Sequence, residues 1–508
     1  MKIKATIIVL LLTILSLQLF SQDKLIQAAT NGDLDKVERL LKDGVDVNSR
    51  NIDSCTALMY AAVEGNLDVC KLLISKGALI NTIDNSGIAV LYYSIDGEDT
   101  ETIKFLINNG VDLSSKSAYG YPVLIYMMDF DMPEIFDLMI EKGADINAKD
   151  DKGLTLLSYV MEMEDINLSK KLVNNGAEVN VKNENQLPMI HKAIKMENNE
   201  FAKFFVQKGA NVNIKNKEGL TALAYSLKNK NLELADFLIS NKANINAKDN
   251  YDQSVLFYAL ETEDISFVKK LINSGVKVSG SNRNDQSALL YSLDKEYFEL
   301  ARIFIDKGVS LRKRDRNDRT ALVIAIEKGN LELTKYLILK GSVLNERFKD
   351  DKSLLMFSAA SSQSNPAMID FLISKGEELK KVDFRGRNAL LYAAMSGSLE
   401  NLKYLQKLGL NIRTKDGLQA TAIHCAAEGG NVKVIKYLLE NENFLVDFID
   451  NNKQTSLHYA AKNNKAEAVK YLISQDAEVN AFDIREKTPI NYTDSDKVYK
   501  ILKENRAY

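Results

Sequence analysis

The sequence repeats itself every 33 residues, and this period constrains the fold more than any other feature. A turn-type residue followed two positions later by leucine or isoleucine returns at spacings of 33 nine times, and then at 35, 33, 34 and 33. The turn position is occupied by Thr56, Ala89, Pro122, Thr155, Pro188, Thr221, Ser254, Ser287, Thr320, Ser353, Asn388, Thr421, Thr455 and Thr488. A unit this short cannot bury its own apolar face, so the period predicts a stack of units that cover one another.

Glycine supplies a second marker with the same period. Because glycine adopts the left-handed conformation that ends a helix without strain, a periodic glycine predicts a periodic helix end. These glycines are Gly44, Gly77, Gly110, Gly143, Gly176, Gly209, Gly275, Gly308, Gly341, Gly376 and Gly409. Between the markers, apolar positions such as Leu58 and Ala61, and then Leu67 and Leu73, predict two short helices followed by a polar loop.

These segments resemble the ankyrin repeat family. The resemblance is carried by TSLHYAA at 455–461, TAIHCAA at 421–427 and GADIN at 143–147, and it extends over nearly all of the chain after residue 21. It implies an all-α solenoid of stacked helix-turn-helix units, with projecting β-hairpin-like loops that form a concave surface. Some repeats depart from the pattern. Lys242 replaces the helix-end glycine and should cost about 1 kcal/mol if it keeps the left-handed geometry.

The N-terminus predicts export. Lys2 and Lys4 precede an apolar run over residues 5–20, and Ser21 offers a small residue for cleavage. An uncleaved membrane anchor is the alternative, but the run is shorter than the roughly 20 apolar residues that a spanning helix needs. We therefore expect residues 1–21 to be a signal peptide, no stable membrane insertion after its cleavage, and a periplasmic or secreted protein if the cell is bacterial.

The repeat phase also divides the rest of the chain. Residues 22–50 are expected to form an N-terminal capping helix pair, residues 51–482 about 13 ankyrin repeats of 33 residues, and residues 483–508 a C-terminal capping repeat. Thr493 and Asp494 replace the alanine pair of the other repeats in this last segment. More polar terminal repeats are what a soluble solenoid requires.

Composition argues against several functional classes. The formal charge of -3 gives no chain-wide basic surface for nucleic acid, and three cysteines and three histidines leave little for catalysis or metal binding. There is no phosphate-binding loop, HExxH, paired-cysteine motif or nucleophile elbow. The histidines, His191, His424 and His458, each lie three positions after a turn residue, and the resemblance implies a structural role for them. We expect no enzyme activity, no cofactor and no metal.

The first candidate surface is basic. The phase places Arg283, then Arg316 and Arg319, then Lys349 and Lys352, then Arg385 and Arg387 at the hairpin tips of consecutive repeats. Repeats that stack in register would align these cations into a basic ridge suited to an acidic partner. The alternative is a solvated charged face without a partner.

The second candidate surface is aromatic. Tyr119 and Tyr121 belong to one hairpin, Phe130 and Met163 lie at the ends of first helices, and Met196 follows in the next repeat, which makes the surface rich in sulfur as well. Exposed aromatic side chains commonly anchor partners, although local packing between adjacent loops and helices would explain them as well.

Together these observations predict a non-catalytic, exported scaffold that binds a partner protein, of unknown identity, through its hairpins and first helices. The alternatives are a structural spacer and a secreted host-directed effector without enzymatic activity. An enzyme with an unrecognised site would require titratable groups clustered across repeats.

Overall fold

The computed structural model describes residues 23–344, 346, 348–363 and 365–508, so the predicted signal peptide at 1–21 lies outside the described residues. Two compact units are present, one ending at Asp249 and the other beginning at Asn250. Each is described by itself below. Among the described residues, no helix has the length and apolar composition that a bilayer crossing would need.

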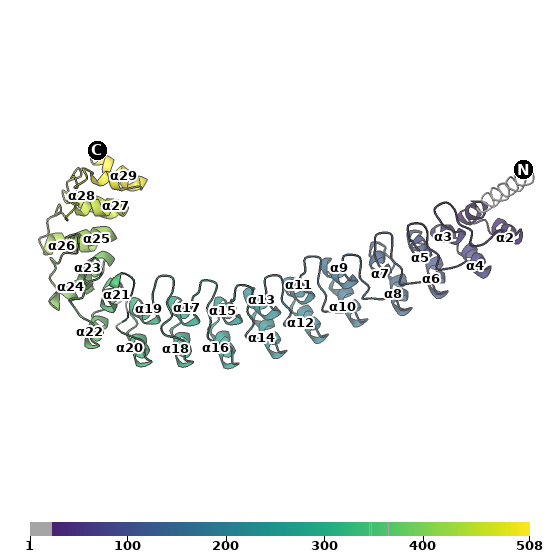
Figure 1. The fold of residues 1–508 in the computed structure, drawn as a ribbon, viewed down its shortest axis with the longest axis horizontal. Coiled ribbons are helices and arrows are strands. Elements are labelled where there is room, and N and C mark those ends of the chain that lie inside the picture. Colours follow the sequence, from purple (N-terminus) through teal and green to yellow (C-terminus); the bar gives the residue numbers. More distant parts are fainter. Residues whose placement is uncertain (1–22, 345, 347, 364) are drawn as a thin grey trace, which may run out of the picture. The chain divides into compact units, whose positions relative to one another are not determined.

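In the first unit, residues 23–30 form a helix that pairs with α2, and six further helix pairs follow (Figure 1). The bounds are α2 Leu34–Lys42, α3 Ala57–Val63, α4 Leu67–Ser75, α5 Val90–Asp96, α6 Thr100–Asn108, α7 Val123–Tyr126, the 3-10 helix η1 Met127–Asp129, α8 Pro133–Glu141, α9 Leu156–Glu162, α10 Ile166–Asn174, α11 Met189–Lys195, α12 Asn199–Gln207, α13 Ala222–Lys228 and α14 Leu232–Ser240.

The second unit continues the same alternation of first and second helices. Its elements are α15 Val255–Glu261, α16 Ile265–Asn273, α17 Ala288–Asp294, α18 Phe298–Asp306, α19 Ala321–Glu327, α20 Leu331–Leu339, η2 Lys349–Asp351, α21 Leu354–Ala360, α22 Pro366–Ser374, α23 Ala389–Ser396, α24 Leu399–Lys407, α25 Ala422–Gly429, α26 Val432–Asn441, α27 Ser456–Lys462, α28 Ala466–Ser474, η3 Pro489–Tyr492 and α29 Asp496–Glu504.

Many of the helices begin at a residue whose side chain caps the first turn. Thr221 accepts a hydrogen bond from the amide of Ala224 (3.4 Å) at the start of first helix α13. At second helices, the Asp99 carboxylate accepts from the Thr102 amide (2.8 Å). Each cap satisfies one of the backbone N–H groups that a helix start leaves without a partner. Where the turn residue supplies such a cap, as at Thr221, it fixes the start of the first helix.

Within each unit, like helices pack on like. First helices α3 and α5 contact each other, as do second helices α4 and α6, and in the second unit α23 packs on α25 and α26 on α28. Ala61 and Ala62 are completely buried between neighbouring helices, where their small side chains permit a close approach. The predicted all-α stack of helix-turn-helix units is confirmed.

The loops between repeats are short hairpins. In the loop before α9, the Asp150 carboxylate accepts hydrogen bonds from the amides of Lys152 (2.9 Å) and Leu154 (2.8 Å). Gly153 takes a left-handed φ of 81°, and a single antiparallel bridge joins Lys149 to Thr155. The carboxylate thus closes the hairpin with the backbone bonds that a short turn would otherwise leave unmade.

A second set of side-chain bonds joins one repeat to the next. The Asn147 side chain donates to the Gly176 carbonyl (3.0 Å) and accepts from the Glu178 amide (2.8 Å). The equivalent Asn213 donates to the carbonyl of Lys242 (3.3 Å), and Lys242 has a left-handed φ of 66°. The lysine at this helix end therefore keeps the geometry expected of the glycine that it replaces.

Candidate partner-binding surface

Position within the hairpin decides whether a side chain is exposed. The residue four places before the turn residue projects outward: Arg283, Arg316 and Lys349 occupy this position in consecutive repeats and are all exposed. The residue immediately before the turn residue points inward, as Leu220 and Ala420, both 0% exposed, demonstrate. This difference sorts the predicted basic ridge into two groups.

The hairpin tips of the second unit are hydrogen-bonded to one another. The Lys349 amide donates to the carboxylate of Asp318 (2.7 Å), and the Phe384 amide donates to the Asp350 carbonyl (3.2 Å). Further along, the Gly417 amide donates to the Arg385 carbonyl (2.7 Å). The tips that carry Arg316, Lys349 and Arg385 are therefore joined to one another. We call the exposed cations and rings of these tips and of the two preceding tips the tip surface, which consists of Tyr251, Arg283, Arg316, Lys349, Phe384 and Arg385.

Two cations of the tip surface lie against exposed rings. The Arg283 guanidinium is 4.7 Å from the ring centre of Tyr251 and donates a 2.9 Å hydrogen bond to the Tyr258 hydroxyl. The Arg385 guanidinium is 5.2 Å from the ring centre of Phe384. Tyr251 is 65% exposed and Phe384 58% exposed. Stacking of this kind orders both the ring and the guanidinium on the exposed face of the tip.

The other two cations remain unengaged. The Arg316 and Lys349 side chains form no ion pair with any residue that the structure describes, and both are exposed. Their charge is consequently available to an external group.

The remaining ridge residues correct the sequence prediction, because they occupy the inward position. Arg387 is only 7% exposed and pairs with Asp416 (3.3 Å) and Glu428 (3.0 Å). Arg319 is half-buried and forms ion pairs with three carboxylates, those of Asp294 (3.0 Å), Asp315 (2.7 Å) and Glu327 (3.1 Å). The expected exposure of Arg387 is wrong.

Lys352 shares this inward position. It is half-buried, with its ammonium 5.4 Å from the ring centre of Tyr392 and 5.8 Å from that of Phe357. Arg319, Lys352 and Arg387 thus bind neighbouring repeats of their own chain.

The predicted aromatic surface does not form one cluster. Tyr119 is 80% exposed at its tip, whereas Tyr121 is half-buried and packs edge-on against Tyr159, with 6.4 Å between ring centres. Phe130 is half-buried at the opposite end of the first helix, where its ring lies 5.5 Å from that of Tyr126. Local packing accounts for Tyr121 and Phe130, and Tyr119 alone projects freely.

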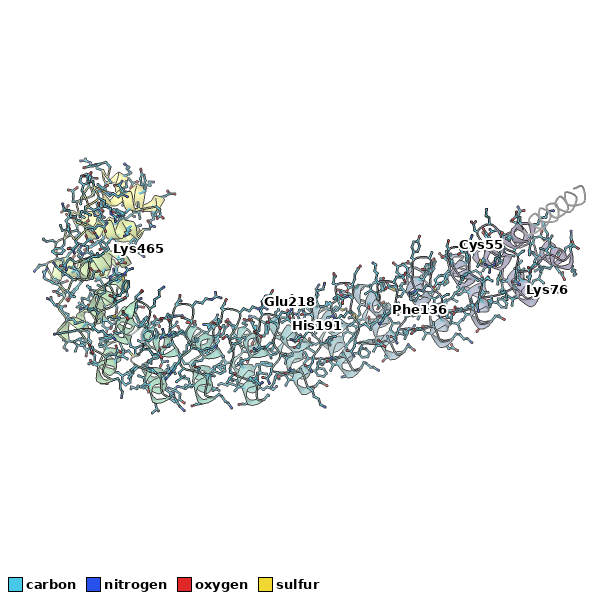
Figure 2. The ribbon with its side chains drawn as sticks, viewed as in Figure 1. Cys55, Lys76, Phe136, His191, Glu218 and Lys465 are labelled. Atoms are coloured by element: carbon cyan, nitrogen blue, oxygen red, sulfur yellow. The ribbon has the colours of Figure 1, made fainter. Side chains whose placement is uncertain are left out.

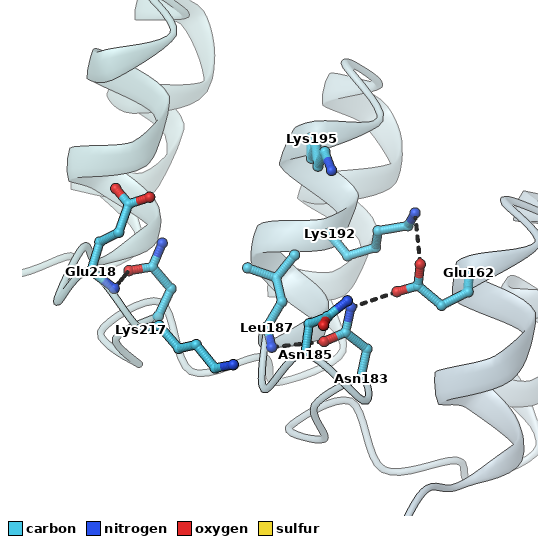
Figure 3. Close-up of a pocket in the computed structure, with 9 residues that line it drawn as sticks. Glu162, Asn183, Asn185, Leu187, Lys192, Lys195, Lys217 and Glu218 are labelled. Carbon is cyan, nitrogen blue, oxygen red and sulfur yellow. Dashed lines mark hydrogen bonds and ion pairs between the residues drawn. The ribbon is translucent and has the colours of Figure 1, made fainter.

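Sequence reasoning missed a polar pocket in the first unit (Figure 3). Its volume is about 230 Å³, and its lining consists of Glu162, Asn183, Asn185, Leu187, Lys192, Lys195, Asn216, Lys217 and Glu218. Lys192 is 6% exposed and contacts Glu162 (3.3 Å) and Glu164 (3.1 Å). The side-chain amide of Asn183 donates to the other carboxylate oxygen of Glu162 (2.6 Å).

The charges of this pocket are largely matched within it. Burial works to lower the pKa of Lys192, but its hydrogen bonds and charge interactions with the two glutamates outweigh burial and raise the pKa. A lysine held in its protonated form cannot act as a base or nucleophile at neutral pH. The sequence feature that could have indicated this pocket is Lys192, because the neighbouring repeats have tyrosine, Tyr159 and Tyr225, at the same repeat position.

The histidines form hydrogen bonds between loops, as the resemblance implies. His424 accepts from the Thr421 amide at Nδ1 (3.2 Å) and donates from Nε2 to the Gln454 carbonyl (3.3 Å). His458 repeats this arrangement with Thr455 and Lys487 (both 3.2 Å).

His191, marked in Figure 2, lacks half of this arrangement. Its Nε2 donates to the Leu220 carbonyl (2.9 Å), but its Nδ1 is buried without a partner because Pro188 replaces the threonine and has no amide hydrogen. Burial lowers the pKa of His191 to about 4.

The cysteines are buried and free. Burial raises the pKa of Cys70 and that of Cys425 to about 12 each, so both thiols are protonated at neutral pH. Within the described part of the chain, no group of three or more histidine, cysteine, aspartate or glutamate side chains is arranged to hold a metal ion.

The stacked helix pairs and joined hairpin tips define a solenoid protein that presents an extended surface. The family model described as ankyrin repeats (3 copies) matches residues 25–117, 124–216, 190–280, 256–348, 339–416 and 410–483, and the chain belongs to this family. Ankyrin repeats are generally protein–protein interaction modules, and the family is typically non-catalytic. No curated protein matches the chain.

Proposed function

We propose that this protein is a non-catalytic scaffold that binds an acidic partner protein through the tip surface of its second unit. The observation that carries the proposal is the set of exposed cations, Arg283, Arg316, Lys349 and Arg385, on the tips of consecutive repeats, of which the last three are hydrogen-bonded to one another. A rigid array of like charges steers a complementary partner and fixes its register.

The carboxylates around these cations offset their charge only in part. Asp318 pairs with Arg314 (2.8 Å) and accepts the Lys349 amide, and Asp315 pairs with Arg319. The exposed carboxylates of these tips belong to Asp252, Asp285, Asp350 and Asp351. Since Arg312 and Lys313 are also exposed beside the Arg316 tip, the exposed cations outnumber the exposed carboxylates there.

The two ring–guanidinium pairs add anchors to the charged array. Tyr251 and Phe384 expose apolar area at either end of the row formed by Arg283, Arg316 and Lys349. Aromatic and arginine side chains are the residue types that most often dominate binding energy in protein interfaces. A protein surface with carboxylates between two apolar pockets would match this pattern.

Export belongs to the same proposal and rests on the N-terminal sequence alone. If residues 1–21 are a signal peptide, the protein recovered outside the cytoplasm begins at Gln22. Fractionation of the native cell with N-terminal sequencing tests this. A cytoplasmic protein that begins at Met1 would overturn export and leave the tip surface unaffected.

The partner is sought by affinity capture with the purified protein and mass spectrometry. The variant Arg316→Glu/Lys349→Glu/Arg385→Glu reverses three charges of the tip surface. Lys307→Glu/Lys407→Glu/Lys433→Glu makes the same charge change at exposed positions in, or directly after, second helices of the same unit. We expect an acidic protein to be retained by the wild type and the second variant and lost by the first. Equal retention by all three would overturn the tip surface, and no retention by any would favour a spacer.

A further inference from the structure

One repeat of the first unit has an interrupted first helix. The helix α7 ends at Tyr126 after four residues and continues as the 3-10 turn η1, whereas its neighbours α5 and α9 have seven residues each. The second helix of the same repeat begins with Pro133. A proline disfavours the helical conformation of the residue before it, and Met132 has φ -125° and ψ 66°.

The loop between the two helices is rebuilt as a result. Neighbouring repeats turn this corner through a left-handed residue, Glu98 (φ 58°) or Glu164 (φ 60°). The equivalent Asp131 is not left-handed, and Phe130 before it is extended (φ -121°, ψ 132°). The backbone therefore follows a different path between the first and second helices of this repeat.

An apolar cavity of about 170 Å³ lies at this corner. Its lining consists of Met127, Met128, Phe130, Asp131, Met132, Pro133, Phe136, Leu168 and Lys171. Figure 2 labels Phe136 and so shows where this corner lies. The volume is well below the roughly 300 Å³ at which pockets begin to hold small-molecule ligands, so the cavity suits a single side chain. Methionine walls adapt to aliphatic and aromatic shapes alike. We call this cavity the methionine pocket.

The lysines at the rim of the methionine pocket are already paired. Lys171 forms an ion pair with Asp137, and Lys104 on the neighbouring helix pairs with both Glu101 (3.1 Å) and Glu134 (3.3 Å). Asp129 and Asp131 are exposed and form no ion pair with any residue described by the structure. The rim therefore presents negative charge beside an apolar hollow.

We propose that the methionine pocket binds one leucine, methionine or phenylalanine side chain of a basic partner segment, whose lysine or arginine side chains lie against Asp129 and Asp131. Burial of one such side chain supplies the affinity, and the two carboxylates select for flanking cations. This site lies at the end of the first helix away from the hairpin tips and selects a partner of the opposite charge. It is independent of the function proposed for the tip surface.

Methyl NMR on protein labelled with ¹³C at the methionine methyl groups tests the proposal. The probes are a pentapeptide with leucine between two lysines on each side, the same peptide with alanine for leucine, and the same with glutamates for lysines. We expect the first peptide to shift the methyl signals of Met127, Met128 and Met132, and the other two peptides to bind about tenfold more weakly.

Variants make the assignment specific. Met128→Trp fills the pocket, and Asp129→Lys/Asp131→Lys reverses its rim, so each should abolish the shifts. Glu141→Lys/Glu178→Lys changes the same charge at exposed positions of the first unit and should leave them unchanged. The remaining methionine signals report whether each variant is folded. The absence of shifts with every peptide, equal binding of all three peptides, or equal binding to the rim-reversed variant would each overturn the proposal.

Discussion

The guanidinium of Arg387 and the carboxylate of Asp416, 3.3 Å apart, form an ion pair in which both side chains are almost fully buried, 8% and 2% exposed. The two residues belong to consecutive repeats, and Glu428 completes the arrangement at 3.0 Å. An arginine in the inward hairpin position therefore joins its repeat to the next one.

Loss of this arginine should destabilise the protein strongly. Arg387→Leu leaves the Asp416 charge buried without its partner, which typically costs about 3 to 5 kcal/mol. Arg385→Leu, two residues away on the exposed side of the same tip, should change the free energy of unfolding by about 0.5 kcal/mol or less. Chemical denaturation of the two variants measures the difference in unfolding free energy. Equal losses would contradict the assignment of Arg387 to a buried position and Arg385 to an exposed one.

Restoring the missing threonine before His191 should stabilise the protein. Pro188→Thr supplies an amide and a hydroxyl near Nδ1, as Thr421 does for His424 (3.2 Å from the amide nitrogen), and should gain about 1 kcal/mol by satisfying a buried group. The control is Pro122→Thr, because Ile125 stands three positions after it and cannot accept the bond. A gain at both positions, or at neither, would argue against the unpaired Nδ1 as the cause.

Stability should decline as the pH falls below about 6.5, the pKa of histidine in unfolded chains. Burial lowers the pKa of His191 to about 4 in the folded protein. Between about pH 6.5 and pH 4 the unfolded chain therefore binds a proton that the folded protein does not, and acidification favours unfolding. The contribution of neutral His191 to the free energy of unfolding is fully present above pH 6.5, and roughly 3 kcal/mol of it is lost by about pH 4. His191→Gln should flatten the pH dependence of the unfolding free energy in this window, and an unchanged slope would contradict the prediction.

Lys192 should behave differently from Arg387 although it too is a buried cation. Its partners Glu162 and Glu164 are 48% and 61% exposed, so water can solvate them if the lysine is removed. Lys192→Met should therefore change the unfolding free energy by about 1 kcal/mol or less, because the glutamates that lose the lysine remain in contact with water and no buried charge is left without a partner. A loss comparable to that of Arg387→Leu would show that the carboxylates depend on the lysine.

The fold was predictable because each repeat contains its own local signals. The turn residue marks the start of a first helix, as at Thr221, and a left-handed residue marks the end of a second helix, as at Lys242. Two markers with one period leave little freedom in how the helices stack. Pattern alone was sufficient here.

The candidate surface was only partly predictable, because exposure depends on single positions within a hairpin. Arg385 and Arg387 are two residues apart in one basic segment, yet one is exposed and the other is only 7% exposed. Other repeats have apolar, buried residues at the position of Arg387, such as Leu220, and this comparison indicates that the position points inward. The methionine pocket required the structure, since the sequence indicates only that Pro133 is tolerated at a helix start and does not specify the path of the loop before it.

The most direct test of the tip surface is the dissociation constant of the captured partner, measured for the wild type and for both charge-reversal variants at two salt concentrations. We expect Arg316→Glu/Lys349→Glu/Arg385→Glu to weaken binding by at least about a hundredfold at low salt, with a smaller loss at high salt, because exposed charges are screened. Lys307→Glu/Lys407→Glu/Lys433→Glu should bind within about twofold of the wild type, since changes outside an interface rarely alter affinity. Equal affinity of the two variants, or a loss that salt does not alter, would contradict the account.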